Sequence, residues 1–247
     1  WWQTETGWPI CSNPMGLEPM ATKPGSSSVP TPGFNVKVLQ GADEQQITGE
    51  KGAIAIKLPL PPGCLTTIWQ DHQRFVDGYL REFEGYYSTG DNGYVDEDGY
   101  VFIMGRTDDV INVAGHRLST GEMEEVLAGH PAIAECSVIG IHDALKGQLP
   151  VGLVLLKDGV TVDEQALEQD LVQRVRDKIV PVACFKRAIV VNRLPKTRSG
   201  KILRKLLRQI AANESVAVPS TIDDPSSVSE IETLMREKGL VNKPTAV

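Results

Sequence analysis

The sequence predicts an α+β fold in two parts: a β-rich part, followed by a smaller part in which a short sheet is flanked by helices. Three observations predict it. Residues 1 to about 106 contain short apolar runs punctuated by Gly and Pro. From about residue 109, apolar residues alternate between helical and strand spacing. The chain, at 247 residues, is longer than one typical domain and can bury a sizeable core.

In the first part, strands are expected at the apolar runs 34–39 and 53–58. Two further short strands are expected around Asp98-Gly99, which is a strong hairpin signal. Asp91, Asp96 and Asp98 could suggest a calcium loop, but the distal glutamate ligand is missing from the pattern. The spacing therefore favours a plain turn.

The second part begins with a helix expected after Ser119, because Ser119 and Glu122 form a capping box and Gly129 with Pro131 ends the helical pattern. Strands are expected at 133–141, 151–156 and 188–191, which are apolar runs.

A helix is expected between the last two of these strands, at about 163–178. Its first turns are acidic and its last turns hold Arg174, Arg176 and Lys178, an order that complements the helix dipole. Another helix follows Lys201, and these elements complete a compact unit of about 100 residues. From Ser215 onward, Ser and Pro residues predict a loose tail with one short helix around 230–238.

Composition narrows the class of partner. The formal net charge of −7 argues against a general nucleic-acid binder. The four cysteines are scattered without a CxxC pair, so a reduced interior is a simpler interpretation than a disulfide framework. The sequence contains no apolar run of membrane-spanning length and no recognisable signal segment, so no membrane partner is expected.

The loop Pro195–Lys201, with sequence PKTRSGK, is expected between a strand and a helix. It is polar, contains Ser199-Gly200, and ends in a lysine that can swing. Such a lysine suits a transient anion, such as a phosphate or a developing carboxylate–phosphate anhydride. An ordinary loop with solvated cations is the other interpretation, and this segment alone does not decide between them.

Four clusters occur in one order along the chain: WWQTETG at 1–7, YSTGD at 87–91, GRTDDVINVAGHR at 105–117, and the lysine loop. Together they resemble the C-terminal part of the short-chain acyl-CoA synthetases, members of the adenylate-forming superfamily, over nearly the whole chain. Residues 8–10, 58–63 and 220–225 look more like propionyl-CoA synthetases than like acetyl-CoA synthetases.

The resemblance implies that residues 1–107 are the end of a large AMP-binding domain, that 108–214 form a mobile C-terminal lid and that 215–247 are a tail. It implies formation of an acyl-adenylate from ATP with Mg²⁺ and a short-chain carboxylate, with propionate favoured by the three segments. Transfer of the acyl group to coenzyme A follows. Asp108 matches the hinge, and the lid rotates there between an adenylating and a thioester-forming pose.

The resemblance also implies roles for individual residues. Lys201 would be catalytic, Trp2 would floor the acyl pocket, and Glu5 would hold Mg²⁺. The expected ATP- or AMP-binding residues are Trp1, Trp2, Gln3, Thr4, Asp91, Arg106 and Arg117, and the expected coenzyme A-binding residues are Ala114, Gly115 and Arg176.

Each of these residues also has an ordinary structural interpretation. The tryptophans could pack in a core, Glu5 could be a surface carboxylate, Asp91 could cap a turn, the arginines could form surface salt bridges, and Arg176 could simply complement a helix dipole. Most acetyl-branch members have serine at position 114, which disfavours a side-chain role for Ala114. Ala128, His130 and Ile133 match a peripheral metal site of relatives, but His130 before Pro131 is more simply a helix stop.

The phosphate-cradling loop of the family and most of its acyl pocket precede the WWQTETG segment in relatives, so the chain is expected to be a C-terminal piece that is inactive alone. The family's small-molecule substrates, a cytoplasmic or mitochondrial location, and a lysine acetyltransferase and deacetylase acting on Lys201 are the implied setting. Three alternatives stand: another short-chain (acetyl-type) synthetase, a non-catalytic interaction fragment, and a nucleic-acid module using Lys201, Arg204, Lys205 and Arg208.

Overall fold

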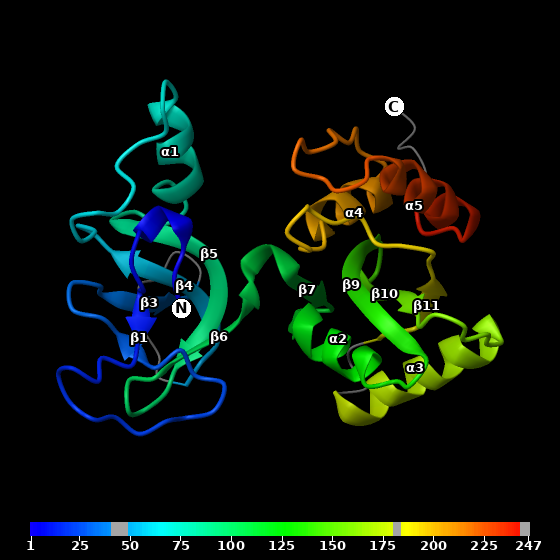
Figure 1. Ribbon diagram of the computed structural model, residues 1–247, viewed down its shortest axis with the longest axis horizontal. Helices are drawn as coiled ribbons and strands as arrows, with labels where there is room; N and C mark the ends of the chain where they lie inside the picture. Colours follow the sequence, from blue (N-terminus) through cyan, green and yellow to red (C-terminus); the bar gives the residue numbers. More distant parts are fainter. Residues whose placement is uncertain (41–48, 180–183, 243–247) are drawn as a thin grey trace. The chain divides into compact units, whose positions relative to one another are not determined.

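The computed structural model describes residues 1–40, 49–179 and 184–242, with Arg117 described by its backbone alone. The chain divides into two compact units, Trp1–Thr107 and Asp108–Val247. Each unit is mixed α+β and has its own sheet (Figure 1). Among the described residues, no strand of one unit pairs with a strand of the other.

The first unit is built on a four-stranded antiparallel sheet of order β3-β4-β5-β6, beside a two-stranded sheet β1-β2. Tyr87 of β5 and Ile54 and Ile56 of β4 are buried at its centre. The elements are η1 (Thr4–Thr6), β1 (Cys11–Ser12), β2 (Val29–Pro30), β3 (Val36–Leu39), β4 (Gly52–Lys57), α1 (His72–Tyr79), β5 (Tyr86–Val95) and β6 (Val101–Arg106).

The hairpin expected around Asp98-Gly99 joins β5 to β6 and is confirmed. Asp96 Oδ1 accepts hydrogen bonds from the backbone N–H groups of Asp98, at 3.0 Å, and Tyr100, at 2.9 Å. Gly99 adopts a φ of 82°, which favours glycine. The Lys23 ammonium bonds both Asp96 and Asp98. The carboxylates therefore cap a turn and bind a lysine.

Helix α1 was not predicted from the sequence. Asp71 caps it by accepting the backbone N–H of Arg74 at 3.1 Å. Phe75 is the only residue of the helix that is buried. Because apolar periodicity is the main sequence signal for a helix, a helix with one buried residue leaves little trace.

The second unit has a five-stranded sheet of order β11-β10-β7-β8, with β9 paired to β10. The β10–β11 pair is parallel and the other pairs are antiparallel. The elements are η2 (Thr107–Asp109), which crosses the unit boundary, β7 (Val110–Val113), β8 (His116–Ser119), α2 (Thr120–Ala128), β9 (Ile133–Asp143), β10 (Gly147–Leu156), α3 (Glu164–Lys178), β11 (Arg187–Val190), α4 (Arg204–Ala211) and α5 (Ser226–Glu237).

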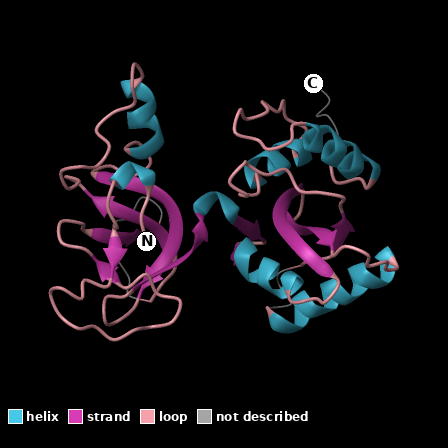
Figure 2. Ribbon diagram, in the orientation of Figure 1, coloured by secondary structure: helices cyan, strands magenta, loops and turns pink. Residues whose placement is uncertain are grey.

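Helices cover both faces of this sheet (Figure 2). Val138 of β9 packs into a core with α2 and α3, whereas the next residue, Ile139, packs into a core with α4 and α5. Successive side chains of a strand point to opposite faces, so the near-continuous apolar runs expected for β9 and β10 correspond to strands buried on both sides. The N-cap half of the expected capping box is present, since Ser119 Oγ accepts the Glu122 N–H at 3.4 Å.

The loose tail predicted from Ser215 onward is wrong. Helix α5 starts at Ser226, four residues before the predicted short helix, and packs Val228, Ile231 and Met235 into the core shared with α4. The cause was a Ser- and Pro-rich composition that obscured a short amphipathic repeat.

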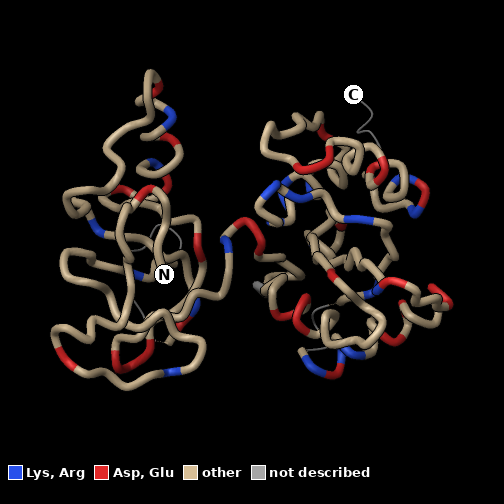
Figure 3. The backbone as a smooth tube through the Cα atoms, in the orientation of Figure 1, with Lys and Arg blue, Asp and Glu red and all other residues tan. Residues whose placement is uncertain are grey.

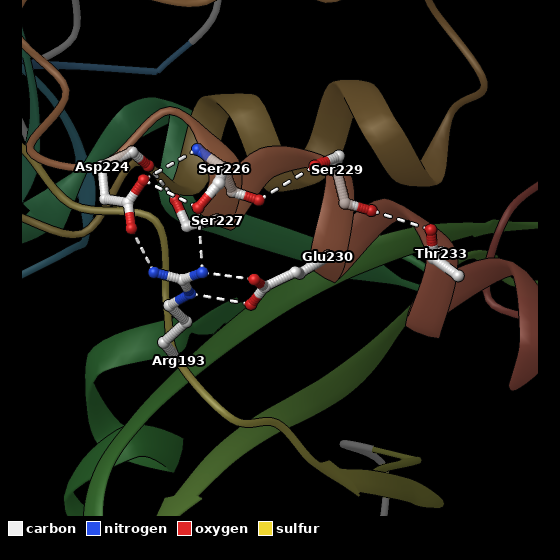
Figure 4. A network of polar contacts seen from close by, with 7 residues as sticks. All are labelled: Arg193, Asp224, Ser226, Ser227, Ser229, Glu230 and Thr233. Carbon is white, nitrogen blue, oxygen red and sulfur yellow. Dashed lines mark hydrogen bonds and ion pairs between the residues drawn. The ribbon is translucent and has the colours of Figure 1, made fainter.

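A network of polar contacts also connects the start of α5 to the segment that follows β11 (Figure 4). The Arg193 guanidinium bonds the carboxylates of Asp224 and Glu230, and its NH2 group donates to Ser226 Oγ at 2.9 Å. Since Arg193 lies just after β11, this fork ties the start of α5 to the sheet.

Across the described ranges, no helix combines the length and the apolar character needed to cross a membrane.

Candidate active site

The first unit brings three of the sequence clusters together around Asp91. Its Oδ2 accepts hydrogen bonds from Trp1 Nε1 at 3.1 Å and from Gln3 Nε2 at 3.0 Å, and its Oδ1 lies 3.4 Å from Arg106 NH1. Gln3 Nε2 and Arg106 NH1 also donate to the Thr89 carbonyl oxygen, at 2.7 and 3.0 Å. Segments 1–7, 87–91 and 105–106 thus converge on one carboxylate.

Asp91 is 7% exposed, so it is a buried carboxylate with several donors. Burial raises its pKa, and the Arg106 guanidinium and the Trp1 and Gln3 hydrogen bonds oppose that rise. An ionised carboxylate is acceptor-only and suits a ligand that presents hydroxyl groups.

Gly90, next to Asp91, adopts a φ of 67°. A Cβ atom there would lie 2.5 Å from Arg106 NH2. The glycine of the YSTGD cluster therefore lets the guanidinium approach the strand.

The segment of residues 1–7 is held in place by a reciprocal contact: Gln3 N donates to Thr6 Oγ1 at 3.2 Å, and Thr6 Oγ1 donates to the Gln3 carbonyl at 2.9 Å. Gly7 follows with a φ of 63°, and a Cβ atom there would lie 3.0 Å from the Gly63 carbonyl oxygen. This local structure explains why the cluster ends in glycine.

The side chains of segment 1–7 differ in exposure. Trp1 packs against the core of the first unit and uses its indole N–H on Asp91, whereas Trp2 is 60% exposed. Core packing, the other interpretation of the two tryptophans, applies to Trp1 and not to Trp2 in this structure. Both residues line a cavity of about 390 Å³, together with Lys23 and Tyr100.

Glu5 is connected to this cluster through two tyrosines. The Tyr79 hydroxyl donates to Glu5 Oε1 at 2.8 Å, and the Tyr79 ring is stacked on Tyr87 with centroids 5.3 Å apart and planes at 4°. The Tyr87 hydroxyl donates to Gln3 Oε1 at 3.0 Å. Burial raises the pKa of both phenols, with the Glu5 carboxylate adding to the rise, so both stay protonated donors. No sequence signal pointed to Tyr79.

In the second unit, Ala114 and Gly115 form the two-residue turn between β7 and β8, with φ values of 49° and 87°. Two positive φ values are typical of a type I′ hairpin turn. Ala114 N donates to the Lys146 carbonyl oxygen at 2.8 Å, which ties the turn to the β9–β10 connection. Arg117 pairs with Asn112 through the β7–β8 register, but its side chain lies outside the described part of the chain.

The lysine loop is more ordered than its composition suggests. Thr197 N donates to the Lys201 carbonyl at 2.9 Å, Lys201 N donates to Thr197 Oγ1 at 3.1 Å, and Gly200 has a φ of 83°. Arg198 N donates to the Thr221 carbonyl at 3.0 Å, so the segment after α4 supports the loop. Lys201 itself is exposed, and among the described residues its ammonium has no hydrogen-bond or ion-pair partner.

Helix α4, which follows the loop, is anchored by two ion pairs. Arg204 Nε and NH2 bond the two carboxylate oxygens of Glu124 at 2.9 and 2.7 Å, and Arg208 NH1 lies 2.5 Å from Asp109 Oδ1. Lys and Arg are interspersed with Asp and Glu along both units (Figure 3). Two of the four cations proposed for a nucleic-acid stripe are therefore neutralised within the unit, which weakens that alternative.

Two expected site residues, Arg176 and Asp108, and the suggested metal position at His130 lie elsewhere in the second unit. Arg176 is exposed in the last turn of α3, and Asp108 lies in η2 at the unit boundary. At the suggested metal position, His130 Nδ1 accepts the Ala132 N–H at 3.1 Å and its Nε2 lies 3.2 Å from Asp170. Both ring nitrogens of His130 are thus engaged.

Comparison with known proteins places these clusters in a family context. Residues 122–201 match the family described as AMP-binding enzyme C-terminal domain. The chain is 56% identical over 96% of its length to an uncharacterized protein of Pseudomonas aeruginosa and 44% identical over 99% to the mitochondrial acyl-CoA synthetase short-chain family member B of Dictyostelium discoideum. It is 42% identical over 96% to the acetyl-coenzyme A synthetase of Pyrobaculum arsenaticum. It spans 35–38% of the length of these three curated relatives.

Solved structures of adenylate-forming enzymes are also similar to this chain. The anthranilate CoA ligase AuaEII, solved in complex with anthranoyl-AMP, aligns with 84% of this chain and 38% of its own, at 29% identity and a TM-score of 0.68. Acetoacetyl-CoA synthetase from Streptomyces lividans aligns with 87% of this chain and 32% of its own, at 24% identity and a TM-score of 0.76, and shows the fold alone. Together, the comparisons support assignment of this chain to the adenylate-forming, AMP-binding superfamily, with an AMP-binding enzyme C-terminal domain at residues 122–201.

Proposed function

We propose that this chain forms part of an ATP-dependent short-chain acyl-CoA synthetase. The enzyme joins a carboxylate to AMP, releases pyrophosphate, and transfers the acyl group to coenzyme A. The observation that carries the proposal is the convergence of Trp1, Gln3 and Arg106 on the buried carboxylate of Asp91. Below, "complete enzyme" means a protein of the relatives' length that contains this sequence.

The first unit supplies nucleotide contacts in this proposal. Asp91 accepts the ribose hydroxyls, Arg106 supports the ribose and phosphate end, and Trp1 offers its ring to the adenine. Thr4, which is exposed, donates to a phosphate oxygen. From the second unit, Arg117 of β8 is proposed to neutralise phosphate charge.

Mg²⁺ would be held at Glu5. The site fits the ion in donor chemistry, because a carboxylate oxygen is a ligand that Mg²⁺ prefers, and Oε2 of Glu5 has no partner among the described residues. When bound, the ion neutralises charge on the phosphates of ATP. Magnesium keeps water and substrate phosphates as ligands, so a single protein carboxylate is sufficient.

The second unit supplies the lysine and the coenzyme A contacts. Lys201, whose ammonium is unpaired among the described residues, would stabilise charge that develops between the carboxylate and the α-phosphate. Asp108 is proposed as the hinge, and the Ala114–Gly115 turn and Arg176 as coenzyme A contacts. The exposed loop also makes Lys201 a candidate for acetylation, which would remove its charge. The compartment is proposed to be the cytoplasm or the mitochondrial matrix, in keeping with the mitochondrial relative.

Propionate is the proposed acid, and Trp2 the pocket floor. The basis is the resemblance of residues 8–10, 58–63 and 220–225 to propionyl-CoA synthetases. Acetate is the alternative, because the sequence identity of the chain to an acetyl-coenzyme A synthetase, 42%, is close to its 44% identity to the Dictyostelium discoideum relative. Rates of the complete enzyme with acetate, propionate and butyrate decide between them. Trp2→Gly should shift the preference toward longer acids, since each buried methylene is worth about 0.8 kcal/mol.

Separate half-reactions test the assignment of Lys201. In the complete enzyme, Lys201→Ala should slow carboxylate-dependent ATP–pyrophosphate exchange about 10²–10³-fold, while a supplied acyl-adenylate is still converted to acyl-CoA. Lys205→Ala, an exposed lysine on α4, is the matched control and should leave both rates near wild type. Equal loss of both half-reactions in a folded Lys201→Ala protein would refute the role.

A further inference from the structure

Tyr79 and Tyr87 connect the two ends of the proposed nucleotide site. The connection runs from Glu5 Oε1 to the Tyr79 hydroxyl, across the ring stack to Tyr87, and from the Tyr87 hydroxyl to Gln3 Oε1. Gln3 in turn donates to Asp91. The metal end and the ribose end of the proposed site therefore share one continuous set of contacts.

The Tyr79 hydroxyl is fixed in position by its surroundings. Its ring is stacked on Tyr87, whose side chain is fully buried, and lies 5.6 Å from the ring of Phe75, which α1 buries in the same unit. Moving the hydroxyl would separate these rings, and aromatic pairs of this kind are stabilising beyond the area they bury. A glutamate side chain, by contrast, has several rotamers and gains a single orientation only from its contacts.

The Tyr79–Glu5 bond selects which carboxylate oxygen is left for a ligand. Tyr79 occupies Oε1, and the described residues give Oε2 no partner. The backbone of Glu5 is fixed separately, because its carbonyl accepts the Leu65 N–H at 2.6 Å. With the main chain and one oxygen held, Oε2 has a defined position.

We propose that Tyr79 is a positioning residue: it orients the Glu5 carboxylate so that Oε2 faces the Mg²⁺ that accompanies the nucleotide. The inference rests on the proposed function, in which Glu5 is the Mg²⁺ ligand. It makes α1 part of the nucleotide site through Tyr79, although no residue of α1 is among those expected to touch a substrate.

Equilibrium binding of α,β-methylene-ATP to the complete enzyme, with Mg²⁺ and with EDTA, tests the proposal without turnover. Tyr79→Phe removes one oxygen atom and keeps the ring stack. We expect it to raise the Kd for the Mg²⁺ complex about ten- to a hundredfold, which is the range for a hydrogen bond to a charged group, and to leave the Kd in EDTA within about twofold. Tyr94→Phe is the control, since Tyr94 lies on β5 and stacks on Phe102, away from Glu5.

A double-mutant cycle separates positioning from a general structural effect. In a Glu5→Gln background, Tyr79→Phe should have no further effect on binding of the Mg²⁺ complex, because it acts only through the carboxylate. If Glu5→Gln weakens Mg²⁺-nucleotide binding but Tyr79→Phe does not, the positioning role is overturned and the proposed function stands. An equal effect of Tyr79→Phe with and without Mg²⁺ also overturns it. If Glu5→Gln itself changes nothing, the metal assignment in the proposed function is what fails.

Discussion

Substituting Met235 by alanine should destabilise the second unit and leave the first unchanged. Met235 lies on α5, in the segment whose composition resembles a loose tail, yet its side chain is fully buried. It packs in one core with α4, β9 and β10. The prediction therefore tests whether this segment is integral to the unit that carries the lysine loop.

The structure sets the size of the effect. Truncating a fully buried methionine to alanine typically costs about 2–5 kcal/mol, from lost transfer free energy and the cavity left behind. The segment after residue 214 buries five large apolar side chains, Ile222, Val228, Ile231, Met235 and Leu240. At about 1.5–3 kcal/mol each, their burial is worth roughly 7–15 kcal/mol, which is comparable to the whole stability of a typical domain. Deleting the segment should therefore unfold the second unit.

The distribution of chromophores provides the assay. All four tryptophans and all five tyrosines lie at or before residue 100, in the first unit. Tryptophan fluorescence therefore follows unfolding of the first unit, whereas far-ultraviolet circular dichroism follows both. Met235→Ala should move the dichroism transition to lower urea without moving the fluorescence transition. Glu237→Ala, an exposed change on the same helix, is the control. An unshifted dichroism transition would refute the packing argument.

Three further predictions follow from polar contacts and one glycine. Glu124→Gln should lower the unfolding free energy of the second unit by about 2–3 kcal/mol in the dichroism assay. This is below the roughly 3–5 kcal/mol typical of breaking a fully buried ion pair, because the side chains of Glu124 and Arg204 are 15% and 28% exposed. Glu125→Gln, the control, should change this free energy little. The Lys23 hydrogen bond holds the pKa of Asp96 below its usual range, so Lys23→Met should raise that pKa in a carboxyl NMR titration. Because the pKa of Asp96 is lower in the folded state, its ionised form stabilises the fold at pH values above the ordinary aspartate pKa. That contribution is lost as the pH falls through the lowered pKa of the folded state. The stability difference between wild type and Lys23→Met should therefore be largest near neutral pH and should shrink in acid. Gly90→Ala should displace the Arg106 guanidinium and cost more in the fluorescence assay than Gly99→Ala, which has a similar positive φ but open space around its Cβ position; equal costs would argue against the clash.

The sequence predicted most of the second unit because its signals are local. Ser119 caps α2 as its position indicated, α3 begins where the acidic turns predicted it, and the apolar runs became strands β9, β10 and β11. These features depend on residues only a few positions apart, and each apolar pattern extends over enough residues to identify the element.

The contacts that build the candidate site could not be predicted in the same way. The Trp1 indole N–H reaches Asp91, 90 positions away, and Tyr79 stacks on Tyr87 from a helix with one buried residue. The family resemblance supplied the residue types at this site, and only the fold supplied their partners. A short helix was expected near α5, but its packing into the core was not, because tertiary packing there overrides a composition typical of linkers.

Each sheet is formed by strands of one unit only, and this has an energetic consequence. Every paired strand before residue 108 finds its partner before residue 108, and every paired strand after it finds its partner after it, among the described residues. Turning one unit against the other would thus break none of the inter-strand hydrogen bonds of either sheet. In the proposed rotation at Asp108, a bound substrate would then need to prefer one arrangement by only a few kcal/mol to reverse the populations.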